Sequence, residues 1–266
     1  MARKATATCF GPDGATYGDP VWRKDARAAF AEAERRIALT RKTDWAGRAP
    51  ALFFHDLNAL EALPESVSDL PDLQKICFYT DAYGKRKQRG AHQLADCAAL
   101  RGISALTVLE FWETQVRDLT PLSHLEQLEE LYLCFANTAD LGPLAPLRKV
   151  KYLNVSNTDI ADLTPISAWT GLTDLYTGRT RISDIGALSR LGALRRLYIN
   201  HSGVSDISVL ANCATLQELN LSHSGVTDIS PLSGLADLTD LNIIGCAISD
   251  LEPLETLPRL SNLERD

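Results

Sequence analysis

Hydrophobic and polar positions recur along this chain with a period of 22 residues. The clearest marker is an aspartate that is followed each time by Leu or Ile, at Asp118, Asp140, Asp162, Asp184, Asp206, Asp228 and Asp250. A leucine column keeps the same register at Leu109, Leu131, Leu153, Leu175, Leu197, Leu219, Leu241 and Leu263. Because the aspartate and leucine columns keep the same 22-residue period, they indicate a stack of similar structural units. An isolated sheet or helix bundle would not require such a fixed period.

Each unit has a readable local structure. Its L-x-L phrase has a period of two, which predicts a short strand with both leucines inward and the intervening residue outward. The D-[IL]-x-P-L phrase predicts a turn in which proline opens a short helical segment and aspartate accepts backbone N–H groups. A metal-binding row of aspartates is the alternative, but like charges one strand apart repel, so we expect capping. One unit cannot bury its apolar edge alone, so the units stack.

The unit L-x-x-L-x-L-x-x-[TSCA]-x-[IV]-x-D-[IL]-x-P-L, over residues 103–266, resembles the repeat of internalin-type and related bacterial leucine-rich-repeat proteins. This resemblance implies an α/β leucine-rich-repeat solenoid. In such a fold a curved right-handed coil carries parallel strands on its concave face and short 3-10 or helical turns on its convex face. The family often has asparagine at the position held here by Thr114, Ala136, Thr158, Thr180, Ser202, Ser224 and Cys246, so we expect hydroxyl groups to bond neighbouring backbone there.

Upstream of the regular repeats the pattern is looser. We expect an N-terminal segment over 1–48 and a repeat domain over 49–266, irregular over 49–102 and regular over 103–266. A helix over about 22–40 should cap the core, with Ala26, Phe30, Ala33 and Ile37 on its inner face. Residues 52–54 and 76–78 match the strand phrase, which makes about nine strands, with a tenth beginning at Leu263.

Residues 79–102 interrupt the period. Their first half is basic, and His92 to Leu100 reads as a short helix. Insertions at strand ends of solenoids often contact ligands, so this segment is a candidate second contact for an acidic partner. A solvated loop is the alternative. The cations concerned are Lys85, Arg86, Lys87 and Arg89.

Composition and charge limit the classes of partner and the cellular compartment that we expect for the protein. With 266 residues, a net charge of -7 and a pI near 5.3, the chain lacks the basic surface typical of nucleic-acid binding. The sequence has no signal-like start and no apolar run long enough for a membrane span. The six cysteines form no Cys-x-x-Cys pair, which favours reduced thiols in a cytoplasmic protein.

Aromatic residues gather at the outward positions of the predicted strands, although they make up only 7% of the chain. Tyrosine suits strands in general, yet a solvated face has no need of tryptophan and phenylalanine as well. Tyr, Trp and Arg anchor protein interfaces, so we predict a partner-binding concave face. Its candidate residues are Trp112, Tyr132, Phe135, Tyr152, Tyr176, Arg179, Tyr198, His201 and His223.

Signatures of catalysis are missing from the sequence. His201 and His223 fall in adjacent repeats, but no third ligand shares their column, so we expect neither metal nor cofactor. There is no G-x-S-x-G, phosphate-binding Gly loop or H-E-x-x-H motif. The sequence therefore predicts a non-enzymatic protein-recognition module, a regulator or inhibitor of one partner. The alternative is an immunity-type protein whose acidic charge neutralises a toxin or enzyme, or a recognition subunit of a larger assembly.

Overall fold

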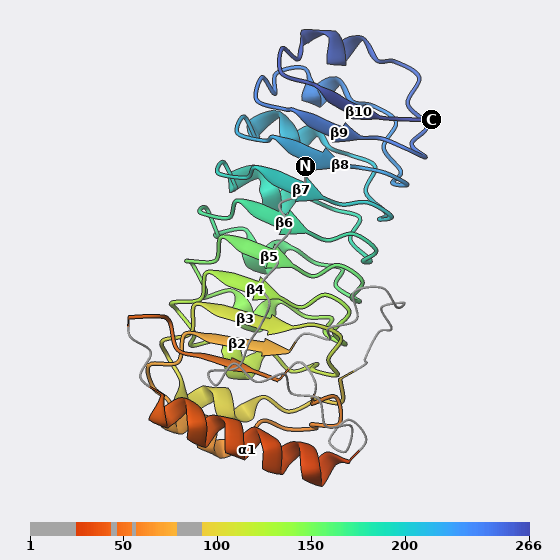
Figure 1. Ribbon diagram of the computed structural model, residues 1–266. Helices are drawn as coiled ribbons and strands as arrows, with labels where there is room; N and C mark the ends of the chain where they lie inside the picture. Colours follow the sequence, from red (N-terminus) through yellow and green to blue (C-terminus); the bar gives the residue numbers. More distant parts are fainter. Residues whose placement is uncertain (1–24, 44–46, 55–56, 79–91) are drawn as a thin grey trace.

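Parallel strands stack in chain order, from β1 to β10, into one open and curved sheet (Figure 1). The computed structural model describes residues 25–43, 47–54, 57–78 and 92–266. Its strands are β1 (Ala51–Phe53), β2 (Lys75–Phe78), β3 (Val108–Phe111), β4 (Glu130–Tyr132), β5 (Tyr152–Asn154), β6 (Asp174–Tyr176), β7 (Arg196–Tyr198), β8 (Glu218–Asn220), β9 (Asp240–Asn242) and β10 (Asn262–Glu264). The strand leucines pair in register, as Leu131 does with Leu153, and the tenth strand predicted at Leu263 is confirmed.

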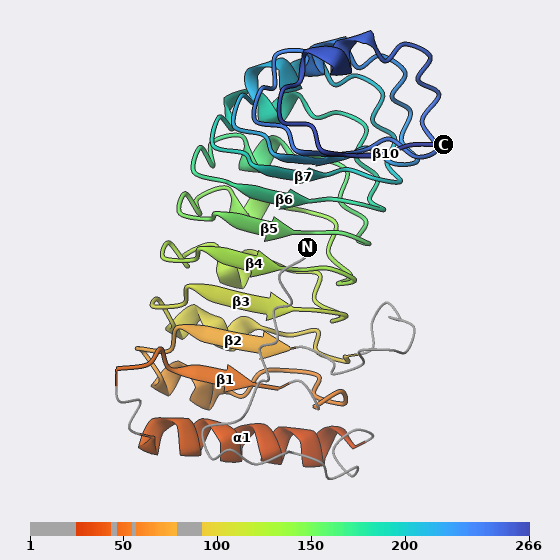
Figure 2. The ribbon, with the colours of Figure 1, turned by 45° about the horizontal axis from the view of Figure 1, so that its top comes forward.

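A row of short 3-10 helices covers the side opposite the sheet, so the strands form the concave face (Figure 2). These helices are η2 (Glu65–Asp69), η3 (Ala98–Gly102), η4 (Thr120–Leu122), η5 (Gly142–Leu144), η6 (Thr164–Ile166), η7 (Gly186–Arg190), η8 (Ser208–Asn212), η9 (Ser230–Leu232) and η10 (Glu252–Thr256). One continuous core lies between strands and 3-10 helices and is built from the repeated leucines. The predicted leucine-rich-repeat solenoid is therefore correct.

The repeated aspartates cap their own turns, as predicted. Asp162 Oδ1 accepts a hydrogen bond from Thr164 N at 2.7 Å, just where η6 begins. The other six aspartates of the column accept from the backbone N–H two residues on in the same way. Because each carboxylate is committed to an otherwise unpaired N–H, the column is a structural device of the turn.

These caps predict a specific acid sensitivity. Hydrogen bonds from the residue two positions on hold the pKa of four carboxyls below the ordinary 3.8. A carboxyl with a lowered folded-state pKa stabilises the fold above its unfolded pKa and loses that contribution as pH falls through the folded value. We expect the urea concentration at the midpoint of unfolding to decrease when the pH is lowered below about 3.8. The decrease should be smaller in a variant whose capping side chains keep the acceptor oxygen but cannot be protonated. That variant carries Asn at Asp118, Asp162, Asp206 and Asp228; parallel pH curves for the two proteins would contradict the capping account.

Helix α1 (Ala26–Lys42) lies against β1 and η2 and closes the first end of the core (Figure 1). Its N-cap is Asp25, which accepts hydrogen bonds from the backbone of Arg27 and Ala28. The predicted inner face is partly wrong, because Phe30 is 42% exposed while Ala29 is buried. The buried stripe is rotated relative to the prediction, and it includes two charged residues that apolar periodicity does not reveal.

Those charged residues are Glu32 and Arg36, which are 6% and 5% exposed and lie 2.8 Å apart. Arg36 Nη1 also donates to the carbonyl oxygen of Phe53 at 2.8 Å, on the free edge of β1. Burial by itself would raise the pKa of Glu32, but hydrogen bonds from Arg35 and Arg36 outweigh it and lower that pKa. The helix therefore contacts a strand edge through a satisfied ion pair as well as through apolar packing.

The helix expected over His92 to Leu100 is absent from this described stretch. Residues 92–97 are irregular apart from an isolated parallel bridge between Asp96 and Ala62, and Ala95 N donates to Glu61 O in the preceding repeat at 2.8 Å. Asp96 then caps η3 by accepting from Ala98 N at 2.8 Å. Asp96 lies 22 residues before Asp118, so it extends the column of capping aspartates by one repeat. The basic residues Lys85, Arg86, Lys87 and Arg89 lie outside the described residues.

Candidate binding face

Five aromatic side chains of the concave face form one continuous row, which we call the aromatic stack. Neighbouring ring centroids lie 6.3, 4.5, 5.2 and 4.7 Å apart, with interplanar angles between 27° and 32°. Such offset pairs each contribute about 0.5–1.5 kcal/mol beyond the area they bury. The members, in order along the solenoid, are Trp112, Tyr132, Tyr152, Tyr176 and Tyr198.

Parallel strands at a spacing of about 4.8 Å bring these rings to stacking distance. In β4, β6 and β7 the ring comes from the residue between the two buried positions of the strand phrase. In β5 that position is Asn154, and the ring instead comes from Tyr152, whose strand partner in β4 is Glu130. Tyr132 therefore meets Tyr152 on a diagonal, which keeps the row continuous across β5 although its central residue is an asparagine.

Two hydroxyl groups of the aromatic stack are hydrogen-bonded to neighbouring carboxylates. Tyr132 Oη donates to Glu130 Oε2 and Tyr198 Oη donates to Glu218 Oε2, both at 2.9 Å. Burial raises the pKa of Tyr132 and of Tyr198, and the nearby carboxylates act in the same direction. The hydroxyls therefore remain protonated hydrogen-bond donors at neutral pH.

Carboxylates flank the aromatic stack along the concave face. Two of them are neutralised by cations, in the ion pairs of Lys75 with Glu110 at 2.7 Å and of Arg196 with Asp174. In the described part of the chain no lysine or arginine pairs with Glu130, Glu218 or Asp240. The face therefore keeps negative charge beside its aromatic surface, a feature that the sequence-based choice of residues missed. The residue before each first strand leucine lies on the outward face by period two, which is the signal that identifies Glu130 and Glu218.

A second column follows the strands, where the chain leaves the sheet in the left-handed conformation. Its φ angles lie between 52° and 61° at six non-glycine residues, and Gly245 continues the column at 70°. This conformation lets each residue's N–H donate to the next repeat, as Asn157 N does to Gly178 O at 2.9 Å. We call this row the strand-end column; its non-glycine members are Glu113, Phe135, Asn157, Arg179, His201 and His223.

The left-handed backbone of the strand-end column predicts that position 157 tolerates glycine but not a β-branched residue. Asparagine and glycine adopt positive φ readily, whereas a β-branched residue meets its own backbone there. We expect Asn157→Val to lower the free energy of unfolding by about 1–2 kcal/mol and Asn157→Gly to change it by less than about 0.5 kcal/mol. Urea denaturation of both variants measures this, and equal losses would show that the side chain matters and the backbone conformation does not.

Arg179, His201 and His223 stand side by side at the ends of β6, β7 and β8. Arg179 Nη2 lies 3.0 Å from His201 Nε2, and the two imidazole rings stack with centroids 4.4 Å apart. Partial burial lowers the pKa of His201, and the charges of Arg179 and His223 lower it further. The predicted adjacency of the two histidines is therefore confirmed, and Arg179 joins them.

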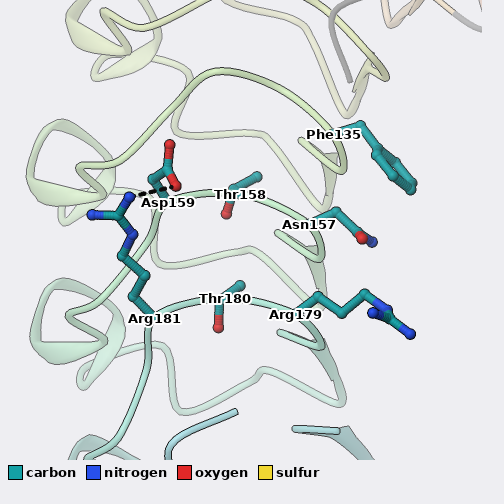
Figure 3. Close-up of a pocket in the computed structure, with 7 residues that line it drawn as sticks. All are labelled: Phe135, Asn157, Thr158, Asp159, Arg179, Thr180 and Arg181. Carbon is teal, nitrogen blue, oxygen red and sulfur yellow. Dashed lines mark ion pairs between the residues drawn. The ribbon is translucent and has the colours of Figure 1, made fainter. Parts of the chain in front are cut away.

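An open depression lies beside this column (Figure 3). Phe135, Asn157 and Arg179 project together on one side of it, and Arg181 pairs with Asp159 at 3.2 Å on the other. The threonines between them donate hydrogen bonds from their hydroxyl groups to backbone carbonyls of their own repeats, as Thr158 Oγ1 does to Val155 O at 2.6 Å. The predicted hydroxyl-to-backbone bonds are therefore confirmed at Thr158, within the repeat itself. Phe135 belongs to this rim and not to the aromatic stack.

Two negative findings apply to the described residues alone. They contain no group of three or more His, Cys, Asp or Glu side chains placed to hold a metal ion. No helix among them is long and apolar enough to cross a membrane.

Comparisons with known proteins agree with this architecture. Residues 214–256 match the family model described as Leucine Rich repeats (2 copies). Internalin C2 from Listeria monocytogenes is 26% identical with a TM-score of 0.68, over 90% of this chain and 92% of that one. Another Listeria internalin (inlF) is 25% identical with a TM-score of 0.57, over 79% of this chain and 75% of that one. None of the curated proteins is significantly similar in sequence to this chain.

A plant relative shares the fold alone. The ectodomain of a membrane receptor kinase from Arabidopsis thaliana, in complex with Casparian strip integrity factor 2, is 16% identical with a TM-score of 0.63. The match covers 79% of this chain and 27% of that one. Repeats, sheet and comparisons together show a leucine-rich-repeat solenoid fold. Such domains are generally modules for protein–protein interaction and typically non-enzymatic scaffolds.

Proposed function

We propose that this chain recognises a partner protein through the aromatic stack on its concave face. The observation that carries the proposal is a row of five partly exposed, stacked rings on one side of the sheet. A continuous row of partly exposed rings is typical of an interaction surface, and Tyr and Trp supply much of the binding energy at protein interfaces. The plant ectodomain, solved with a bound factor, supports the use of this fold for recognition.

Partner capture from the lysate of the source organism tests the proposal. Wild type is compared with a variant in which Tyr132, Tyr176 and Tyr198 are all alanine, by quantitative mass spectrometry. A partner that is captured by wild type and lost with the variant supports binding at the aromatic stack. A partner that both proteins retain contradicts it and directs attention to residues 79–102.

The alternative function is the neutralisation of a basic toxin or enzyme, or the recognition of such a surface within a larger assembly. It is favoured by Glu130, Glu218 and Asp240, the concave carboxylates without a cationic partner among the described residues. Such a complex would form faster and more tightly at low salt, because exposed charges are screened as ionic strength rises. Association that is insensitive to salt would contradict this alternative.

A cytoplasmic location completes the proposal. It is supported by five described cysteines, all of which are thiols, at Cys77, Cys97, Cys134, Cys213 and Cys246. Burial raises the pKa of Cys97 to about 12, so this thiol stays protonated and unreactive. Fractionation of the source cells tests the location, and recovery in an exported fraction would contradict it.

A further inference from the structure

We propose that Arg179, His201 and His223 form a binding site for an oxyanion, a carboxylate or phosphate group carried by the partner. The inference deepens the proposed function and rests on it, because it names the chemistry that one part of the binding surface accepts. It is carried by the strand-end column, and not by the aromatic stack.

The geometry of the column brings three nitrogen-bearing side chains to one edge of the sheet. They occupy the same position in three successive repeats, with φ of 58°, 52° and 55°. Equal backbone conformation sends the side chains out in parallel, one strand spacing apart. The contacts between Arg179 and His201 and between His201 and His223 are the result.

The hydrogen bond between Arg179 and His201 defines the resting protonation of the site. A guanidinium group can only donate, so His201 Nε2 must be the acceptor and its ring proton must lie on Nδ1. In the described part of the chain no carboxylate pairs with Arg179, whereas Arg181 has Asp159 and Arg196 has Asp174. Arg179 is therefore an exposed cation, and its side chain bonds a neutral imidazole at 3.0 Å.

An incoming oxyanion offers Arg179 a stronger acceptor. Guanidinium groups bind carboxylate and phosphate through two parallel N–H bonds, which are stronger than a bond to a neutral acceptor. Arg179 then releases His201 Nε2, which can take one proton from solvent and donate it in a hydrogen bond to the anion. His223, whose ring stacks on His201 with centroids 4.4 Å apart, lies next in line to offer a ring N–H to the same anion.

Binding is therefore coupled to proton uptake. The charged groups that act on His201 are Arg179 from the end of β6 and His223 from the end of β8, and both are positive when protonated. No described carboxylate acts on it, so the free site disfavours the imidazolium form, and a bound anion reverses that preference. By linkage, affinity rises as pH falls, by about tenfold per pH unit for each proton taken up.

The experiment is a titration of the full chain with sodium sulfate, followed by the NMR signals of the histidine Cε1–H groups. Chloride keeps the ionic strength constant, and sulfate keeps its charge from about pH 7.5 to about pH 5.5, where histidine titrates. The test variants are Arg179→Asn, His201→Asn and His223→Asn, because asparagine accepts the left-handed backbone of this column. The matched control is Arg181→Gln, an exposed arginine two residues away that is already paired with Asp159.

The proposal expects saturable shifts at His201 and His223 that strengthen as pH falls, are lost with Arg179→Asn and persist with Arg181→Gln. Shifts that do not saturate, or that both arginine variants lose equally, would overturn it. A glutamate-rich peptide and a phosphopeptide, titrated in the same way, distinguish carboxylate from phosphate as the source. Because sulfate binding needs no partner, a failed titration is distinguishable from failure of the aromatic stack to bind protein.

Discussion

Replacement of Leu153 by alanine should lower the free energy of unfolding by about 2–5 kcal/mol. Leu153 is the central residue of β5, is 0% exposed, and lies between Leu131 and Leu175 in the leucine column. The loss combines the transfer free energy of the removed methyl groups with the cavity left in a core that neighbouring repeats share. Urea denaturation followed by circular dichroism measures the change.

Leu263 provides the matched control for this prediction. It holds the same repeat position in β10 but is 37% exposed, because no described strand packs beyond it. Leu263→Ala should therefore lower the free energy of unfolding by less than about 1 kcal/mol. Equal losses for the two variants would mean that burial in the stack does not decide how much a repeat leucine stabilises the fold.

Replacement of Tyr132, Tyr176 and Tyr198 together by alanine should weaken the affinity for the captured partner by at least about 100-fold, or about 2.7 kcal/mol. The three rings belong to the aromatic stack, and truncation of a single interface anchor commonly costs about 2 kcal/mol or more. The loss should be smaller than the sum of single variants, because removal of one ring also loosens its stacked neighbours. Titration calorimetry with the purified partner measures the affinity.

Two controls separate the causes of that loss. Phenylalanine at the same three positions keeps the rings and removes the hydroxyls, so a retained affinity would assign the binding to ring surface. Phe30→Ala removes a 42% exposed ring from α1, far from the concave face, and should leave affinity unchanged. If Phe30→Ala weakened the complex as much as the tyrosine variant, the aromatic stack would not be the binding site.

Periodicity in the sequence was sufficient for the architecture. The leucine and aspartate columns predicted the strands, the capped turns and the solenoid, because every repeat meets the same physical requirement to bury one edge. Where periodicity was weak, prediction failed in identifiable ways. The helix expected over residues 92–100 is a repeat turn, and the 22-residue spacing of Asp96 from Asp118 was the overlooked signal.

The prediction of the buried face of α1 failed for a different reason. Apolar spacing placed Phe30 inside, whereas the structure buries Glu32 and Arg36, whose charges neutralise each other and whose guanidinium contacts Phe53 O. A charged residue is buried at acceptable cost only when a partner is in place. That partner comes from the fold, so periodicity along one helix does not reveal it.

For the candidate site, the sequence by itself determined which side chains point out of the concave face, because a strand alternates its faces whatever it packs against. It identified the tyrosines on this basis, and Arg179 and both histidines from the column that follows each strand phrase. Only the tertiary structure decided that Tyr132 stacks diagonally on Tyr152, that Phe135 stands apart from the row, and that Arg179 donates to His201. These outcomes depend on strand spacing, register and the left-handed strand ends, which arise when the repeats stack against one another.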